Sequence, residues 1–347
     1  MKIALITYHY SSNNGATMQT YALCRYLKEQ GHDLQIIDIR QDEHWSVPFY
    51  VRIAKVLIQE RRINKFIEKH FPPLTRRYTT LEELQNDSPN ADCYMVGSDQ
   101  TWNPTISKDL CLVYFLDFGS DSVRRISYAS SFGIKEWPKE EKRTVRVKEC
   151  LERFDALSVR EQEGANLCMH TFGIEPKVVL DPCFLNADYK ELLGKVKQKN
   201  QIVCYKLNKT LDFYNNMPIL KAQLHLPALL LNENYPQKGF KYVFNPGVEK
   251  WLKILAGAKY VVTDSFHGAV FSILFHRQFI VTLNHDSKDS RLITLMRSMG
   301  LEDYLLDNLA DIKKNNHWLK QINWTEVDER KNALVKASQN YLLDALR

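Results

Sequence analysis

The chain opens on MKIALITYHYSSNNGATMQTYALCRYLKEQGHDLQIIDI, residues 1–39, and the order of patterns in this stretch decides the fold class. Residues 2–7 are a short apolar run typical of a buried strand, and residues 15–30 carry apolar side chains at helical spacing. Gly31 offers the left-handed residue that commonly ends a helix, and residues 33–39 form a second apolar run. A strand, a helix and a second strand in this order predict a parallel sheet with a right-handed crossover.

The same alternation recurs along the rest of the chain. Further strands are expected at residues 92–96, 125–129, 154–159, 177–180, 201–207, 227–231, 259–263 and 278–283. Helices are expected at residues 51–70, 139–151, 161–170, 248–256, 266–276 and 287–299. A polar, lysine-rich stretch at residues 186–200 separates the two runs. We therefore expect two α/β domains, 1–185 and 186–315, with a cleft between them and ligands at the carboxyl ends of the strands.

Composition places the chain among globular proteins. Its 347 residues make about two domains at roughly 150 residues each. A hydrophobic fraction of 44% and a charged fraction of 25% exclude a disordered or collagen-like chain. No apolar run approaches the roughly 18 residues of a spanning helix, and the N-terminus lacks a signal-peptide pattern. The seven cysteines form no CxxC pair, which favours reduced thiols and a cytoplasmic protein.

The charge pattern bears on partners. The net charge of +6 is spread along the chain, which favours anionic small molecules or a membrane surface over nucleic acid. No pair of His or Cys has the spacing of zinc ligands, so no metal is expected. Residues 52–77 hold eight Lys or Arg and two Glu. This basic segment suits peripheral contact with an anionic inner membrane, and a solvated helix face is the alternative.

The sharpest local signal is VVTDSFHG, residues 261–268. An apolar strand ends at Thr263, and both Asp264 and Ser265 are good N-cap residues for the helix that follows. His267 falls in the first turn, where backbone N–H groups and the helix dipole attract anions. A histidine there can contact a phosphate or carboxylate and donate a proton. The alternative is that Asp264 or Ser265 only caps the helix and His267 only packs.

Two arginines follow predicted strands in a similar way. Arg160, in LSVREQ, lies at the carboxyl end of a strand just as a helix begins. Its planar fork matches a phosphate or carboxylate, and a surface salt bridge with Glu161 or Glu163 is the alternative. Arg291, in HDSKDSRL, lies at the start of a later helix. A helix-surface arginine is the alternative there.

Two polar loops also follow expected strands. The loop HYSSNNGA contains Gly15, which allows close backbone approach, and Asn13 and Asn14, whose amides suit sugar hydroxyls. The loop MVGSDQTWNP contains Ser98, Asp99, Gln100 and Trp102. A tryptophan ring packs well on the apolar face of a sugar, so this loop is a candidate for carbohydrate binding. Well-hydrogen-bonded turns are the alternative for both loops.

Taken together, these motifs resemble the polysaccharide pyruvyl transferase family. The matching pieces run in family order from about residue 5 to residue 301. They are ITYHYSSNNGATMQTYALCRYL, MVGSDQTWNP, SYASSFG, LSVREQEGANL, VVLDPCF, VVTDSFHGAVFSILF and SRLITLMRSMGL.

The resemblance implies a fold of two Rossmann-like domains with parallel sheets facing a cleft, similar to GT-B glycosyltransferases. Helices within residues 316–347 are then expected to pack back on the first domain. The implied reaction moves a pyruvyl group from phosphoenolpyruvate onto two hydroxyls of a sugar in a bacterial surface glycan, giving a ketal and phosphate. The acceptor is a sugar or a lipid-linked oligosaccharide, and no cofactor is implied beyond phosphoenolpyruvate as co-substrate.

By position, the donor-site histidine of the family falls on His267 and a donor-site arginine on Arg160. We assign His267 as general acid and either Asp264 or Asp99 as the base. Donor contacts are assigned to Arg160, Ser265, Phe266, Gly268 and Arg291. Acceptor contacts are assigned to Asn13, Asn14, Gly15, Ser98, Gln100 and Trp102.

The chain departs from the family pattern at one point. Members often read Arg-Leu-His-Gly where this chain reads Ser265-Phe266-His267-Gly268. Either Arg291 supplies the missing charge or the donor differs. The alternatives are a GT-B-type glycosyltransferase that uses a nucleotide-sugar, and a non-catalytic glycan-binding protein of capsule assembly.

Overall fold

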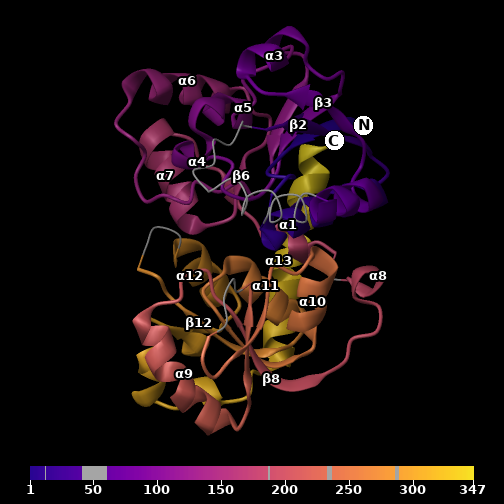
Figure 1. Ribbon diagram of the computed structural model, residues 1–347. Helices are drawn as coiled ribbons and strands as arrows, with labels where there is room; N and C mark the ends of the chain where they lie inside the picture. Colours follow the sequence, from indigo (N-terminus) through magenta and orange to yellow (C-terminus); the bar gives the residue numbers. More distant parts are fainter. Residues whose placement is uncertain (12, 41–60, 187, 233–236, 286–288) are drawn as a thin grey trace, which may run out of the picture. The chain divides into compact units, whose positions relative to one another are not determined.

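The computed structural model describes residues 1–11, 13–40, 61–186, 188–232, 237–285 and 289–347 (Figure 1). These residues divide into two compact units. The first joins Met1–Asn186 with Leu334–Arg347, and the second is Ala187–Ala333. Both units are built on parallel sheets, which confirms the α/β class expected from the sequence. The cleft between them stays a prediction.

The first unit contains a five-stranded sheet in the order β3-β2-β1-β4-β5. Its strands are β1 (Lys2–Ile6), β2 (Asp33–Ile39), β3 (Leu74–Tyr78), β4 (Cys93–Val96) and β5 (Arg124–Ser127). All neighbouring pairs are parallel. The sheet continues from β1 through β2 to β3 on one side and through β4 to β5 on the other. The order of the strands therefore reverses between β1 and β4, which is the topological switch point of this sheet.

Helices and a small second sheet complete the first unit. The helices are α1 (Asn14–Glu29), α3 (Leu81–Asn86), α4 (Pro104–Ser107), α5 (Cys111–Tyr114), α6 (Glu141–Glu152) and α7 (Gln162–Phe172). The small sheet pairs β6 (Ser158–Val159) with β7 (Lys177–Val178). Gly31 follows α1 with a φ of +84°, the left-handed conformation expected there. This residue lets the chain reverse directly into β2.

The end of the last helix, α13 (Trp324–Ala345), belongs to the core of the first unit. Leu342 and Leu346 are buried in one cluster with Leu27 of α1. The Tyr341 hydroxyl donates to the Ser127 carbonyl at 2.8 Å. These contacts fix the C-terminal segment against α1 and β5.

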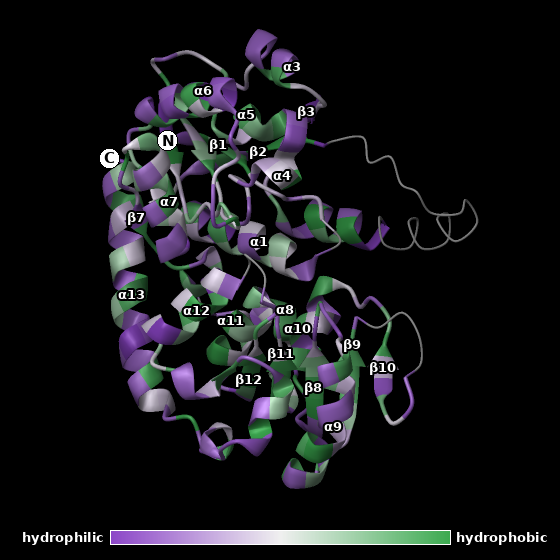
Figure 2. Ribbon diagram, turned by 90° about the vertical axis from the view of Figure 1, so that its left-hand side faces the viewer, coloured by the Kyte–Doolittle hydropathy of each residue, from purple (hydrophilic) through white to green (hydrophobic). Residues whose placement is uncertain are grey.

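The second unit has six parallel strands in the order β10-β9-β8-β11-β12-β13. They are β8 (Lys199–Tyr205), β9 (Ala228–Leu231), β10 (Lys241–Val243), β11 (Ala258–Thr263), β12 (Gln278–Thr282) and β13 (Leu305–Leu306). The helices are α8 (Lys190–Leu193), α9 (Leu211–Leu224), α10 (Val248–Ala256), α11 (Phe266–Leu274) and α12 (Asp289–Ser298). Figure 2 shows the central strands in the hydrophobic colour, and the switch point lies between β8 and β11.

Several expected elements differ from those observed. The strand expected at residues 154–159 is reduced to β6, and β3 lies where the sequence predicted none. Helix α9 was not predicted, because Pro218 and its neighbouring asparagines interrupt the helical signal. Of the helix expected at residues 51–70, residues 61–70 are helical and the remainder lies outside the described residues.

Gly268 permits the close approach of α11 to β11. A Cβ atom at this position would lie 2.2 Å from the Thr263 hydroxyl oxygen and 3.1 Å from the Tyr205 ring. The first turn of α11 therefore has room only for glycine at this position.

Gly268→Ala is expected to lower the free energy of unfolding by about 1–3 kcal/mol, because the added methyl group overpacks a buried turn. Urea denaturation of the full chain measures this loss. Gly247→Ala is the matched control, since nothing lies within 4 Å of a Cβ there. Equal stability of the two variants would contradict the packing argument.

Candidate functional site

A buried lysine lies at the switch point of the six-stranded sheet in the second unit. Lys206 directly follows β8, and its side chain is only 4% exposed. Its Nζ atom donates to the Thr282 hydroxyl at 2.6 Å and lies 3.2 Å from Asp264 Oδ2. Lys206 was not predicted as a site residue, because the sequence pattern places it inside the expected strand 201–207. A charged residue near the end of a buried apolar run was the available signal.

Asp264 fastens the loop that follows β8. Its carboxylate accepts hydrogen bonds from the backbone N–H groups of Leu207 at 2.6 Å and Asn208 at 2.9 Å. The N-cap of α11 is instead Ser265, whose hydroxyl accepts from Gly268 N at 3.4 Å. The two carboxylate oxygens of Asp264 therefore already bind backbone N–H groups and Lys206.

His267 lies in the first turn of α11, as the sequence predicted, and is 5% exposed. Its ring packs edge-on against Phe266 with centroids 5.3 Å apart. The first turn presents the positive end of the helix dipole, and Lys206, paired with Asp264, lies at the same switch point. An edge of this kind can attract an anion and hold an imidazole beside it.

Arg291 lies in α12 and is 8% exposed, so the interpretation as a helix-surface arginine is wrong. Asp289, in the same turn, accepts two hydrogen bonds from Asn284 N at 3.0 and 3.1 Å. Asp289 thus binds the backbone of Asn284, just after β12, much as Asp264 binds the backbone just after β8.

At the switch point of the first sheet, Asp99 adopts a strained backbone. Its φ is +82°, a conformation that residues other than glycine rarely adopt and that often marks functional sites. The Thr7 hydroxyl donates to the Ser98 carbonyl at 2.8 Å and joins the ends of β1 and β4. Asp99 Oδ1 accepts from Gln100 N at 2.8 Å, and its side chain is 12% exposed.

Arg160 is buried beside this aspartate. Its Nη1 donates to Asp181 Oδ2 at 2.8 Å, and its Nη2 lies 3.6 Å from Asp99 Oδ1. Burial alone would lower the pKa of Arg160, but Asp181 and then Asp99 raise it above its usual value. The interpretation as a surface salt bridge with Glu161 or Glu163 is wrong, since the side chain is 1% exposed.

Trp102 does not bind sugar. Its side chain is fully buried, its indole N–H donates to the Tyr114 carbonyl at 2.9 Å, and its ring stacks on Phe115 at 5.3 Å. The sequence showed a tryptophan in a polar loop, but its ring packs on Phe115, directly after α5, and the sequence did not reveal this contact. The sugar-stacking assignment is therefore corrected to a core residue.

The other expected acceptor residues are partly committed to local structure. Asn13 caps α1 by accepting from Gly15 N at 2.9 Å, and Asn14 is buried in the first turn. The Ser98 hydroxyl donates to Asp181 Oδ2 at 3.1 Å. Gln100 is half-buried and accepts from Asn103 at 3.2 Å. The structure thus brings together Ser98, Asp99 and Arg160.

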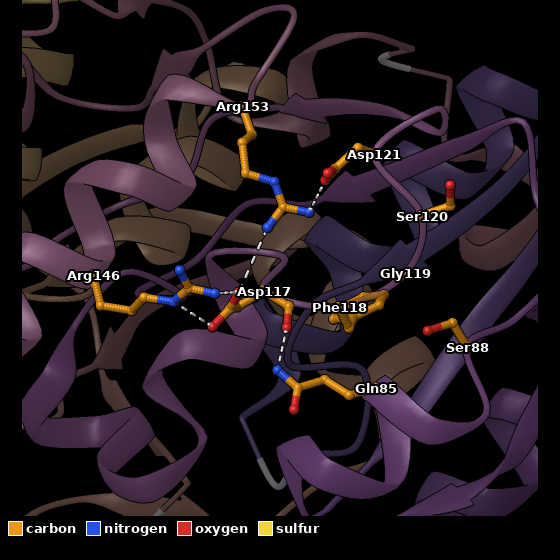
Figure 3. Close-up of a pocket in the computed structure, with 9 residues that line it drawn as sticks. All are labelled: Gln85, Ser88, Asp117, Phe118, Gly119, Ser120, Asp121, Arg146 and Arg153. Atoms are coloured by element: carbon orange, nitrogen blue, oxygen red, sulfur yellow. Dashed lines mark hydrogen bonds and ion pairs between the residues drawn. The ribbon is translucent and has the colours of Figure 1, made fainter.

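A polar cavity of about 640 Å³ lies elsewhere in the first unit (Figure 3). Asp117 is reached there by Arg146 at 2.6 Å and by Arg153 at 3.5 Å. Arg153 also pairs with Asp121 at 2.7 Å. The lining loop precedes β5, so this cavity lies toward the amino ends of the strands. Its arginines pair with carboxylates of the same cluster, which favours a structural role.

A further buried carboxylate lies at the end of β2. Asp38 Oδ1 lies 3.1 Å from His9 Nε2, and the Arg40 guanidinium donates to both carboxylate oxygens at 2.6 and 3.0 Å. Burial would raise the pKa of Asp38, but the hydrogen bonds from His9 and Arg40 hold it below its usual value of 3.8.

Because this pKa is depressed in the folded state, Asp38 contributes stability above the ordinary carboxyl value and loses it as the pH falls through the folded value. The unfolding free energy of the wild type is expected to drop on acidification below about pH 4, and Asp38→Asn is expected to drop less. Urea denaturation across pH measures both. Asp33→Asn, at an exposed carboxylate, is the control that should follow the wild type. Parallel curves for Asp38→Asn and wild type would contradict the assignment.

The model of the family described as polysaccharide pyruvyl transferase matches residues 13–287. The chain therefore belongs to the polysaccharide pyruvyl transferase family. The match contains Asp99, Arg160, Lys206 and His267, whereas Arg291 lies beyond its end. No match is found among curated proteins.

Solved structures share the fold at low identity. A UDP-GlcNAc 2-epimerase from Methanocaldococcus jannaschii, in complex with UDP-GlcNAc and UDP, is 13% identical over 97% of this chain and 100% of its own, with a TM-score of 0.55. MnaA from S. aureus, in a co-structure with UDP, is 9% identical over 98% and 96%, with a TM-score of 0.57. These likenesses support the GT-B-type architecture and nothing beyond the fold.

Among the helices that the structure describes, none has both the length and the apolar character required to cross a bilayer.

Proposed function

We propose that this protein transfers a pyruvyl group from phosphoenolpyruvate to two hydroxyls of one sugar in a bacterial surface glycan. The observation that carries the proposal is His267 in the first turn of α11, at a switch point that also holds the buried Lys206. Phosphoenolpyruvate has the two features that such a site recognises: a phosphate with a carboxylate, and an enol carbon that accepts a proton.

The second unit holds the donor in this proposal. The first turn of α11 and the Lys206 ammonium donate hydrogen bonds to the phosphate, and Arg291 binds the carboxylate. Lys206 and Arg291 thus supply donors where this chain has Ser265 and other family members have arginine. Ser265 caps the helix and Gly268 keeps the backbone close to β11.

His267 protonates the methylene carbon of phosphoenolpyruvate, and the adjacent carbon becomes oxocarbenium-like. One sugar hydroxyl attacks this carbon, phosphate departs, and the second hydroxyl closes the ketal ring. The base takes the proton of the attacking hydroxyl and gives it up again; of the two hydroxyl protons, one restores His267 and the other leaves with the phosphate. The products are a cyclic ketal and inorganic phosphate, and the charges on the donor are met by side chains and a helix end without a metal or resident cofactor.

Asp99 is the better candidate for the base. Both oxygens of Asp264 already accept backbone N–H groups, and that side chain is fully buried. Asp99 keeps some exposure and lies at the switch point of the first unit. We assign Arg160 to positioning Asp99, because Asp181 already takes its stronger hydrogen bond.

A lipid-linked acceptor would bring the protein to the inner membrane from the cytoplasmic side. Arg61, Arg62, Lys65 and Lys69 are exposed on the helical residues 61–70, and suit an anionic surface. Residues 52–60 of the basic segment lie outside the described residues.

His267→Ala is expected to lower kcat by a factor of about 10²–10⁴, the usual contribution of a general acid. Phosphate release from phosphoenolpyruvate in the presence of a glycoside acceptor measures it. His267→Gln preserves side-chain volume, so it separates loss of the proton donor from loss of packing. His170→Ala, at an exposed helix position, is the control. Near-normal kcat in both folded His267 variants would contradict the assignment.

Donor identity is tested by thermal melting. Phosphoenolpyruvate at about 100 times its dissociation constant should stabilise the native state by roughly 2.7 kcal/mol, and His267→Ala should reduce the effect. Matched UDP-, GDP- and CMP-sugars should give no shift. A shift with a nucleotide-sugar alone would favour a glycosyltransferase. Glycan binding without consumption of any donor would favour a non-catalytic protein of capsule assembly.

A further inference from the structure

Tyr8 occupies a distinctive place at the switch point of the first sheet. It lies two residues beyond the end of β1, at the centre of a tight turn in which His9 N donates to the Thr7 carbonyl at 2.8 Å. Turns of this kind are common at strand ends. The turn places Tyr8 on the β1 side of the same edge where Asp99 follows β4.

The hydroxyl of Tyr8 makes no hydrogen bond among the described residues, although it is shielded from water. The ring itself is well packed: it belongs to the rim of the hydrophobic cluster that contains Tyr114, and the two ring centroids are 5.0 Å apart. A buried hydroxyl without a partner is costly in a native protein, and a bound ligand is one way to satisfy it.

Asp99 acts electrostatically on this hydroxyl. Burial, then Tyr114 and Asp99, raise the pKa of Tyr8 well above its ordinary value. Burial and the same carboxylate also raise the pKa of Tyr114. The Tyr8 phenol therefore stays protonated at neutral pH and is able to donate a hydrogen bond.

A protonated phenol beside a carboxylate offers one donor and one acceptor at the same edge. A sugar with two neighbouring hydroxyls presents the complementary pair, because one oxygen can accept while the other hydroxyl donates. An anionic ligand would fit less well, since Asp99 carries like charge.

We propose that the Tyr8 hydroxyl donates a hydrogen bond to an oxygen of the acceptor sugar whose reacting hydroxyl is held by Asp99. This inference rests on the proposed function, because it takes the acceptor to be a sugar. Tyr8 is then an acceptor-binding residue, and the acceptor satisfies a hydroxyl that has no hydrogen-bond partner among the described residues.

Tyr8→Phe tests the inference, because it removes only the hydroxyl and keeps the ring against Tyr114. Two quantities are measured on the full chain. The first is the Tm without ligand, which should stay unchanged or rise, since the hydroxyl makes no hydrogen bond in the part of the chain that the structure describes. The second is the KM for a panel of methyl hexosides and N-acetylhexosaminides, assayed by phosphate release from phosphoenolpyruvate. The acceptor KM should rise roughly 3–10-fold, the usual net worth of one hydrogen bond, while the KM for phosphoenolpyruvate stays unchanged.

Tyr128→Phe is the matched control. Its hydroxyl is also buried but donates to the Leu180 carbonyl at 2.9 Å. This variant should lower the Tm and leave the acceptor KM unchanged, which is the opposite of the Tyr8→Phe result.

Two results would overturn the inference directly. A Tm loss in Tyr8→Phe as large as that in Tyr128→Phe would mean that the hydroxyl is already satisfied in the free protein. An unchanged acceptor KM in Tyr8→Phe would mean that the hydroxyl does not contact the acceptor.

Glycoside binding followed by saturation-transfer NMR separates this inference from the proposed function. If the wild type binds glycosides but not phosphoenolpyruvate, the donor proposal fails, and weaker glycoside binding by Tyr8→Phe still supports the role of Tyr8. If the wild type binds phosphoenolpyruvate but none of the glycosides, the role of Tyr8 is overturned and the donor assignment stands.

Discussion

In a parallel sheet every strand has its carboxyl end at the same edge, and the five-stranded and six-stranded sheets of this protein are parallel throughout the described residues. The side chains that follow the strands therefore lie at this one edge, and no long loop is needed to bring them there. Where the connections from two neighbouring strands run in opposite directions, such sheets have a crevice at this edge. Asp99 in the first unit and Lys206 and His267 in the second follow strands at these two points.

Hydrogen bonds across each switch point keep the edges in shape. The Thr263 hydroxyl donates to the Tyr205 carbonyl at 2.7 Å, and the Thr7 hydroxyl joins β1 to β4 in the same way. Asp264 holds the loop after β8 and balances the charge of Lys206. A buried lysine is costly unless it is paired, so this aspartate makes it possible to keep a cation at an anion-binding edge. The residues with proposed functional roles are thus close in sequence to the residues that hold the loops in place.

The sequence was sufficient for features that depend on local signals. The strands β1 and β2, the helix α1 and the position of His267 in the first turn of α11 all follow from apolar spacing and capping residues. The sequence was insufficient where the contacts of a side chain come from segments far away along the chain. Nothing near Trp102 indicates that the chain around α5 will enclose it, and nothing near Arg160 identifies Asp181. Lys206 was missed because its burial depends on Asp264 and Thr282, which lie far along the chain.

The central claim is that the protein forms a pyruvate ketal. The most direct measurement is carbon NMR of the products after incubation of the full chain with isotope-labelled phosphoenolpyruvate and a methyl glycoside that supports phosphate release. If the proposed reaction takes place, the label appears on the sugar in a quaternary ketal carbon that bears a methyl group, with one phosphate released for each sugar modified. Label recovered only as free pyruvate or as unreacted phosphoenolpyruvate would contradict it.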